Sequence, residues 1–305
     1  MGNKTTFHKP PLTYLQQLQL LKERGLSIED ENRAMLVLSH VNYYRLTPYW
    51  IPFQTNVTTH SFKNGTAFNQ IMELYDFDKE LRLLVFEGIE KIEVSIRAKW
   101  AYELALRYGS HAHMNHQITK NMELYNKNTK DTSKAINQSR EAFIKHHLNK
   151  YQEDSPPIWV VSEVLSLGLL SRLYNNLDDL TVVGFKHSAK EAIANAYTID
   201  FSILESWLHA LTQIRNFSAH HARVWNREFT VTPKLVRSKP SILKGQFEIG
   251  SRKLYNVLVI ILYLLDQIDT SHTLRKRFKQ LLLTHQGYLP QMGFPRDWQN
   301  KTIWH

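Results

Sequence analysis

Residues 74–105 read LYDFDKELRLLVFEGIEKIEVSIRAKWAYELA and lie inside the longest periodic segment of the chain, from Thr66 to Tyr108. Apolar side chains recur there at steps of three and four, at Leu74, Phe77, Leu81, Leu84 and Val85 and again at Ile89, Ile92, Ile96 and Trp100. Because an α-helix has 3.6 residues per turn, this spacing gathers the apolar side chains on one face. The segment therefore predicts one long helix, ended by Gly109.

The segments on either side have similar helical spacing, and none shows the convincing alternation of a half-buried β-strand. Further helices are expected at residues 12–23, 27–39, 158–176, 188–197, 201–226, 249–268 and 272–284. Pro48 and Pro52 are expected to break helical continuation in the aromatic stretch VNYYRLTPYWIPF, residues 41–53. The predicted fold class is all-α.

Two segments lack a clear helical pattern. Residues 110–155 are polar and rich in His, Asn and Lys, so we expect a loop and one weak surface helix there. The sequence Ser155-Pro156-Pro157 is a firm break before the next helix. Residues 227–247 fit either a short hairpin or a plain loop.

The charge balance indicates a polyanionic partner. The 305 residues include 38 Lys and Arg against 28 Asp and Glu, a net charge of +10. Nucleic acid is the commonest polyanion in cytosol, so RNA is a natural partner. A membrane surface is the competing interpretation, but no lysine-rich amphipathic segment with a bulky apolar face supports it. No cysteine is present, which excludes disulfides, thiolate nucleophiles and Cys-based zinc sites.

Neither a signal peptide nor a membrane span is expected. The first residues, MGNKTTFHKPP, are too polar for a signal peptide. The longest apolar run, from Val257 to Leu265, is far shorter than the ~20 residues that cross a bilayer. We therefore expect a cytoplasmic protein without membrane contact.

Residues 201–227, FSILESWLHALTQIRNFSAHHARVWNR, carry the candidate chemistry. On one continuous helix, an apolar arc would contain Phe201, Leu204, Leu208, Leu211 and Ala222. A polar stripe nearly opposite would contain His209, Gln213, Asn216, His220, Arg223 and Arg227. A stripe of amide, imidazole and guanidinium groups without a carboxylate suits a phosphate backbone.

Arg215 interrupts the apolar arc, where an unsatisfied guanidinium would be costly. It is either a structural arginine, paired to a carboxylate such as Glu87, Glu90 or Glu93, or a functional arginine that faces a cleft or interface. His220 is likewise either an ordinary polar residue near a helix end or a catalytic one. The two lie about 140° apart on an ideal helix. Either the helix distorts after Asn216, or two chains each supply part of a site.

Two weaker signals are also present. His111, His113 and His116 form an H-x-H-x2-H pattern that fits a metal site or, as we prefer, a surface loop. Tyr43, Tyr44 and Arg45 are able to stack on RNA bases, although aromatic residues at a helix end are more often packed.

The string RNFSAHHARVWNR, residues 215–227, resembles the signature of HEPN ribonucleases, an Arg and a polar residue followed after three positions by His. The blocks LLKERGLSIEDENRAMLVLSHVNYYRLTPYW, LYDFDKELRLLVFEGIEKIEVSIRAKWAYELA, WVVSEVLSLGLLSRLYNNL and MGFPRDW are similar, in order, to those of the abortive-infection AbiD/AbiF-type family. The resemblance covers about residues 12 to 298. Leu167 departs from it, since an aromatic residue is expected there.

The resemblance implies a helical bundle with a HEPN-like four-helix unit. Residues 1–60 would be an N-terminal helical extension, and residues 61–305 the HEPN-like domain with a polar insertion around 110–155. Arg215, Asn216 and His220 match the catalytic motif, and His221 is the alternative histidine. Gln213, His209, His221, Arg223, Arg227 and Arg45 are expected to bind RNA.

The implied activity is phage defence by metal-independent RNA cleavage in a homodimer, without a cofactor. His220 would either take the proton from the ribose 2′-hydroxyl or deliver a proton to the departing 5′-oxygen. Arg215 would stabilise charge on the phosphate. The products would be a 2′,3′-cyclic phosphate and a 5′-hydroxyl. The alternative is a non-catalytic protein that holds a small structured partner RNA. A pure protein-interaction module is disfavoured by the charge of +10.

Overall fold

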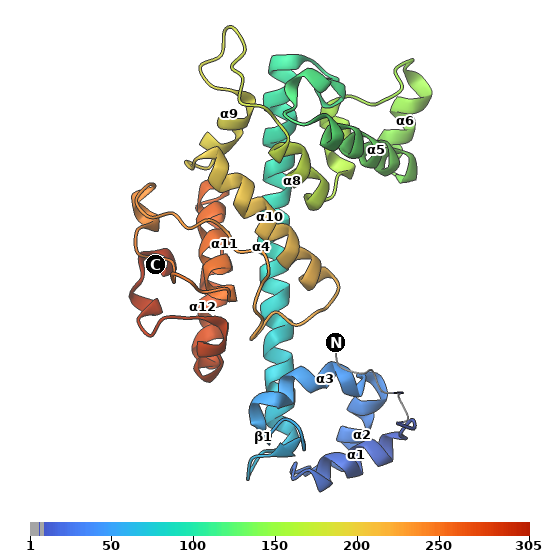
Figure 1. The fold of residues 1–305 in the computed structure, drawn as a ribbon, viewed down its shortest axis with the longest axis vertical. Coiled ribbons are helices and arrows are strands. Elements are labelled where there is room, and N and C mark those ends of the chain that lie inside the picture. Colours follow the sequence, from blue (N-terminus) through green and yellow to red (C-terminus); the bar gives the residue numbers. More distant parts are fainter. Residues whose placement is uncertain (1–5, 7–8) are drawn as a thin grey trace. The chain divides into compact units, whose positions relative to one another are not determined.

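The computed structural model describes residue 6 and residues 9–305, and it confirms the all-α class. Within these residues, the regular structure is helical apart from one two-stranded hairpin. The chain forms two compact units, Met1–Lys79 and Glu80–His305. Their boundary lies within α4 (Phe68–Tyr108), which is the long helix that the sequence predicts (Figure 1). Residues 1–5 and 7–8, on which part of the signal-peptide argument rests, lie outside the described residues.

The smaller unit is a helical cluster with a short hairpin. Its elements are α1 (Tyr14–Glu23), α2 (Glu31–His40), α3 (Tyr43–Trp50), β1 (Gln54–Asn56), β2 (Ser61–Phe62) and the first turns of α4. The helices α1 and α2 pack on each other. Thr13 and Gln16 form a capping box at the start of α1, and the Asp30 side chain caps α2. The strands pair antiparallel, with Gln54 opposite Phe62.

The expectation that Pro48 ends helical structure is wrong, because Pro48 lies inside α3. A proline removes one hydrogen bond, here the one to the carbonyl of Tyr44, four residues earlier. Tyr44 is exposed at the first turn of a helix of eight residues. Water can therefore replace the lost donor. The buried Tyr49 hydroxyl then donates to Asp78 of α4 at 2.6 Å, which ties α3 to the start of the long helix.

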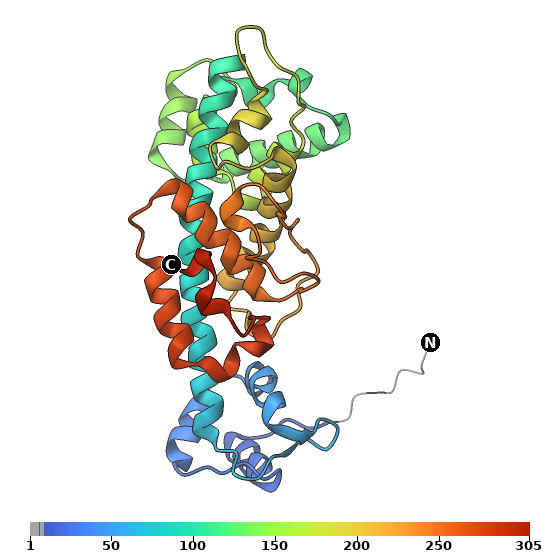
Figure 2. The same ribbon diagram turned by 90° about the vertical axis from the view of Figure 1, so that its left-hand side faces the viewer.

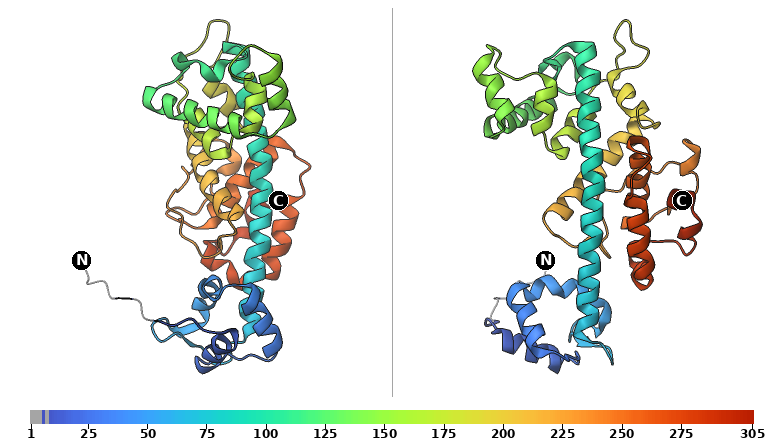
Figure 3. Two further views of the ribbon diagram at one scale, coloured as in Figure 1. Left: turned by 90° about the vertical axis from the view of Figure 1, so that its right-hand side faces the viewer. Right: turned by 180° about the vertical axis from the view of Figure 1, so that it is seen from behind.

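The larger unit is built on α4, α10 (Phe201–Ala219), α11 (Leu254–Ile268) and α12 (Leu274–Thr284). Figures 1 and 2 show α11 and α12 along one flank of α4, with α10 crossing it obliquely. Ion pairs link α12 to α4 through Arg277 and Glu87, and α10 to α4 through Arg215 and Glu93. The remaining helices are α5 (Met122–Gln138), α6 (Ala142–Lys150), α7 (Ile158–Val161), α8 (Leu167–Asn175) and α9 (Ala189–Asn195) (Figure 3).

The core of the larger unit lies around α11. All residues from Leu254 to Leu265 are buried, as expected of a helix that is apolar on every side. Gly88 of α4 permits its close approach, because a Cβ atom at this position would lie 2.7 Å from the Cγ2 methyl of Ile261. Within the described residues, none of the helices has the length and hydropathy of a membrane span.

Two helix predictions are wrong in detail. Residues 110–155 hold two helices, α5 and α6, and α5 is 17 residues long. The buried face of α5 consists of Asn128, Thr132 and Ile136, so hydropathy does not reveal it. The expected helix 158–176 is divided, because Leu165 is extended and Ser166 caps a new helix, α8. Of the two alternatives for residues 227–247, the loop is correct and the hairpin is wrong, because the segment contains no strand and only one short 3-10 helix, Ser241–Leu243.

Candidate functional site

Helix α10 positions the candidate catalytic residues. Asp200 begins it by accepting a hydrogen bond from the backbone N–H of Ser202. Leu204, Leu208 and Leu211 of the predicted apolar arc are buried, together with Trp207 and Ile214. The carbonyl of Lys234 accepts from the indole N–H of Trp207 at 2.9 Å. The helix is therefore fixed along its whole buried face.

The end of α10 differs from the predicted continuation to residue 226. The helix ends at Ala219, and His220 is its C-cap. The N–H of His221 bonds to the carbonyl of Ser218, and the N–H of Ala222 bonds to that of Phe217, at 3.1 and 2.8 Å. These two bonds define a Schellman motif, whose next-to-last residue is left-handed. His221 occupies that position with φ 56°.

The polar stripe is consequently shorter than predicted. His209, Asn216 and His220 are exposed on α10 and its cap. The Gln213 amide is used within the fold, because it donates to Thr230 Oγ1 at 2.6 Å and accepts from the Val231 N–H.

Arg223 and Arg227 lie beyond the helix end, so they do not extend its stripe. Arg227 donates from Nε to the Arg223 carbonyl at 2.7 Å, and its guanidinium lies 4.2 Å from the centre of the Phe217 ring. Arg45 belongs to the smaller unit, where its Nε donates to the Tyr75 hydroxyl at 3.1 Å.

Arg215 points toward α4, as its place in the apolar arc predicts. Its Nε atom lies 3.7 Å from a carboxylate oxygen of Glu93, and its guanidinium carbon lies 5.7 Å from the centre of the Phe86 ring. The Arg215 side chain is 33% exposed and its buried Nε atom has no hydrogen-bond partner in the described structure. Arg215 therefore has features of both interpretations. It has a carboxylate neighbour, as a structural arginine would, and it also faces open space, as a functional arginine would.

That open space is a pocket of ≈ 220 Å³ between α4 and α10. Its lining residues are Phe86, Glu90, Glu93, Val94, Arg97 and Arg215. The Glu93 side chain is only 7% exposed and forms an ion pair with Arg97 one helical turn along α4. Arg97 also donates to the carbonyl of Leu165 at 2.6 Å. Arg97 thus holds Glu93 firmly, whereas Arg215 is held loosely.

The sequence predicted only part of this pocket. Glu93 was one of three carboxylates expected near Arg215, and of the other two Glu90 lines the pocket while Glu87 pairs with Arg277. Phe86 and Arg97 were not predicted. The spacing of Glu93 and Arg97 by four residues on a predicted helix is the one signal that would have indicated their pairing.

Arg215 and His220 do not converge within one chain. The helix is regular through Ala219, so five residues still separate the two directions by about 140°. Of the two alternatives that the sequence left open, a distortion after Asn216 is absent from α10. A site that uses both residues needs a second source for one of them.

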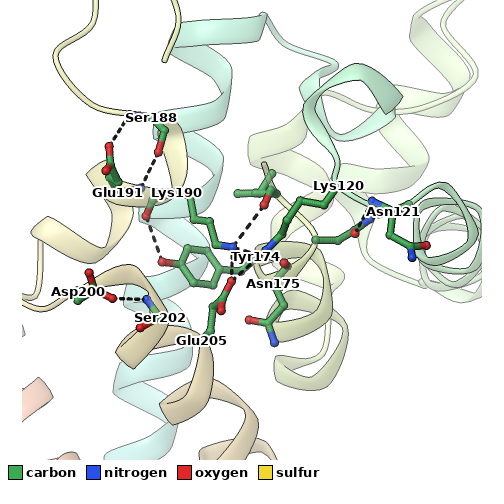
Figure 4. A network of polar contacts seen from close by, with 12 residues as sticks. Lys120, Asn121, Tyr174, Asn175, Ser188, Lys190, Glu191, Asp200, Ser202 and Glu205 are labelled. Atoms are coloured by element: carbon green, nitrogen blue, oxygen red, sulfur yellow. Dashed lines mark hydrogen bonds and ion pairs between the residues drawn. The ribbon is translucent and has the colours of Figure 1, made fainter. Parts of the chain in front are cut away.

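A buried ion network fixes the first half of α10 (Figure 4). The ammonium group of Lys190, from α9, is fully buried and pairs with Glu205 of α10. It also donates to the Leu177 carbonyl at 3.3 Å, and Lys120 lies 3.4 Å from the same Glu205 oxygen. Burial away from water lowers the pKa of Lys190 and raises that of the neighbouring Tyr174 hydroxyl. The network joins α8, α9 and α10, and the sequence did not predict it.

The histidines after α4 are engaged in local contacts. His111 Nε2 lies 3.0 Å from the Ser155 carbonyl oxygen, and His113 Nε2 lies 2.9 Å from Ser155 Oγ. Burial, with a smaller effect of His111, lowers the pKa of His113 to about 4. Among the described residues, no group of three or more His, Cys, Asp or Glu side chains is arranged to hold a metal ion.

Comparison with known proteins defines the family. The model of the family described as "Abi-like protein" matches residues 36–226, which is more than half of the chain and includes Arg215, Asn216 and His220. Neither the curated proteins nor the solved structures give a match. The chain therefore belongs to the Abi-like family, whose name denotes abortive infection, a form of phage defence.

Proposed function

We propose that this Abi-like protein is a metal-independent endoribonuclease that acts in phage defence, with Arg215, Asn216 and His220 at its catalytic site. The observation that carries the proposal is the state of Arg215, whose side chain is 33% exposed and lines the pocket, with its nearest carboxylate contact at 3.7 Å. A planar guanidinium with free donors is suited to bind a phosphate.

The reaction needs one bond to form and one to break. The ribose 2′-oxygen bonds to phosphorus, and the bond from phosphorus to the 5′-oxygen breaks. One proton leaves the 2′-hydroxyl and one reaches the 5′-oxygen, which leaves a 2′,3′-cyclic phosphate and a 5′-hydroxyl. Histidine exchanges protons near neutral pH, so His220 performs one transfer and solvent the other. Arg215 stabilises charge on the phosphate, and Asn216 orients the imidazole or the phosphate.

The site is proposed to form between two copies of the chain. Arg215 and His220 diverge by about 140° on the regular helix α10, so one chain does not aim both at the same phosphate. In a symmetric dimer, Arg215 of one copy and His220 of the other are free to face one RNA strand. RNA is then the substrate, and a homodimer is the active form.

A second candidate is a non-catalytic protein that holds a small structured RNA. The same divergence of Arg215 and His220 favours it, because a scaffold does not require the two side chains to meet. The two candidates differ in cleavage and not in RNA affinity.

The deciding experiment compares four proteins in EDTA with single-stranded RNA. Wild type should produce cyclic-phosphate ends, while Arg215→Ala and His220→Ala should keep RNA affinity and lose cleavage by about 10²-fold or more. Arg172→Ala is the matched control, because it removes another partly exposed arginine, paired with Asp131 on the surface. Cleavage that appears only with added divalent metal would refute the mechanism. Binding without cleavage in all four proteins would favour the scaffold.

A further inference from the structure

A basic groove lies in the larger unit between α12 and the C-terminal segment, outside the Arg215 pocket. Its volume is ≈ 860 Å³, and it is open to solvent. The polar side chains that line it come from Arg275, Lys276, Lys279, Gln280, Thr284 and His305. None of its lining residues is a carboxylate.

The walls of the groove are held by contacts that leave its lysines available. Arg275 donates from Nε to the Ile303 carbonyl at 3.0 Å and pairs with Asp266, so its charge is compensated. Trp304 is fully buried and packs against Trp298, with ring centres 5.0 Å apart. The C-terminal segment is thereby fixed against α12, and the groove is part of the folded structure.

Two cations of the groove have no compensating charge. In the described structure, no carboxylate lies within ion-pair distance of Lys276 or Lys279, whereas Arg277 on the same helix is paired with Glu87. Together with Arg275 these residues place four cations in the first half of α12, and the helix contains no acidic residue. Cations near a helix N-terminus oppose the helix dipole. They therefore do not stabilise α12, and an anionic ligand would offset their repulsion.

We propose that this groove binds the phosphate backbone of RNA and anchors it apart from the cleavage residues. Lys276 and Lys279 are three residues apart and face the same side of α12, so they can contact neighbouring phosphates. Gln280 supplies an amide for phosphate oxygens, and the Thr284 hydroxyl, which donates to the Gln280 carbonyl at 3.0 Å, can accept from a ribose hydroxyl. The inference rests on the proposed function in that the ligand is RNA. A membrane surface fits less well, because only two of the lining residues, Leu283 and Trp304, are apolar, and Trp304 is fully buried.

The test is the salt dependence with which the full-length protein binds a labelled single-stranded RNA of mixed sequence. Lys276→Gln combined with Lys279→Gln should lower the log–log salt slope by about 1.4, since each phosphate contact on a single strand contributes about 0.7. Lys127→Gln combined with Lys134→Gln is the control, because it removes two exposed lysines from α5 and gives the same change of net charge. The control should keep the wild-type slope.

Three outcomes would overturn the inference: an unchanged slope in the groove variant, an equal fall in the control, or lost binding to phosphatidylserine vesicles while RNA binding remains. The RNA concentration dependence of cleavage separates this inference from the nuclease proposal, because the groove variant should need more RNA for half-maximal cleavage, whereas Arg215→Ala should lose cleavage at every RNA concentration. If the groove variant lowers the salt slope but wild type does not cleave RNA, only the nuclease proposal is refuted. If wild type cleaves RNA and the groove variant binds RNA with an unchanged salt slope, only the groove proposal is refuted.

Discussion

Arg215 is held by weaker contacts than Arg97 and Arg107, which also pair with α4 carboxylates. Arg97 binds both Glu93 and the Leu165 carbonyl, and Arg107 binds Glu103 and stacks on the Phe185 ring at 4.2 Å. Arg215 has one carboxylate oxygen at 3.7 Å and a partly exposed side chain. An ion pair of this length that is partly exposed to water contributes little to stability. The residue is therefore free to be replaced without loss of the fold.

The first prediction compares Arg215 with Arg97. Arg215→Ala should lower the free energy of unfolding by less than about 1 kcal/mol, since a partly exposed ion pair is lost and Glu93 keeps Arg97. Arg97→Ala should cost about 3 kcal/mol or more, because Glu93 is buried and loses its firm partner. Urea denaturation of the two variants measures both values. Equal losses would mean that Arg215 is as much a structural residue as Arg97.

The second prediction concerns the left-handed backbone of His221. Helix α1 ends with the same motif, and there the left-handed residue is Gly25, with φ 90°. His221→Gly and His221→Ala both remove the imidazole, but only glycine adopts this conformation without a steric cost. The glycine variant should be more stable than the alanine variant by about 1 kcal/mol. Thermal melting of the pair checks this.

The same pair of variants separates the two candidate histidines. If His220 is the catalytic histidine, His221→Gly should cleave RNA at close to the wild-type rate. Loss of cleavage in a fully folded His221→Gly protein would move the catalytic role to His221.

At the scale of helices, the sequence predicts most where the buried face is apolar. The long helix α4 follows from its leucines and isoleucines, and Gly109 does end it. Helix α5 was missed because its buried face includes Asn128 and Thr132. The end of α10 was missed because residues 220–222 continue the helical polarity pattern, although their backbone hydrogen bonds form a Schellman motif.

For the candidate site too, the periodicity of the sequence predicts only part of the arrangement. Residues on one helix, such as Arg215 and Asn216, are placed by periodicity alone. Phe86 and Arg97 lie more than a hundred positions earlier, and only the packing of α4 on α10 brings them to Arg215. The uncompensated pair Lys276 and Lys279 also becomes visible only once the C-terminal segment is seen to close the groove.

The third prediction tests the network that anchors α10. Glu205→Ala leaves the fully buried ammonium of Lys190 without a counter-charge, so it should cost about 3–5 kcal/mol. Lys190→Met should cost less, because Glu205 keeps Lys120 and the main loss is a donor to the Leu177 carbonyl, worth about 1–3 kcal/mol. Urea denaturation of both variants gives the order. A larger loss for Lys190→Met would mean that the hydrogen bond to the Leu177 carbonyl dominates.

At the scale of the whole larger unit, stability should depend on pH through His113. Its pKa is about 4 in the fold, below the ordinary 6.5, because it is buried near His111. Between these values the unfolded chain binds a proton that the folded chain does not, so stability rises with pH. Acidification from pH 6.5 to pH 4 should cost on the order of 3 kcal/mol from this group, and little more below pH 4.

The matching measurement is chemical denaturation at several pH values for wild type and His113→Gln. The variant should show a shallower dependence between pH 4 and pH 6.5, whatever its stability at pH 7. Identical slopes would mean that another group controls the acid sensitivity.

The last prediction tests whether the active molecule is two chains. Arg215→Ala and His220→Ala are each expected to be inactive, and neither should disturb the fold strongly. Mixed in equal amounts after reversible unfolding, half of the dimers are heterodimers. If each site takes Arg215 from one copy and His220 from the other, every heterodimer has one intact site of two. The mixture should then regain about a quarter of wild-type cleavage.

The expected recovery depends on the divergence of the two side chains along α10. If one chain supplied both residues to its own site, every site in the mixture would lack either the arginine or the histidine, and no activity would return. A mixture of Arg215→Ala with itself controls for refolding, and light scattering shows whether dimers form at all. Full inactivity in a mixture that contains heterodimers, beside an active wild type, would contradict the composite site and mean that each chain supplies both residues to its own site.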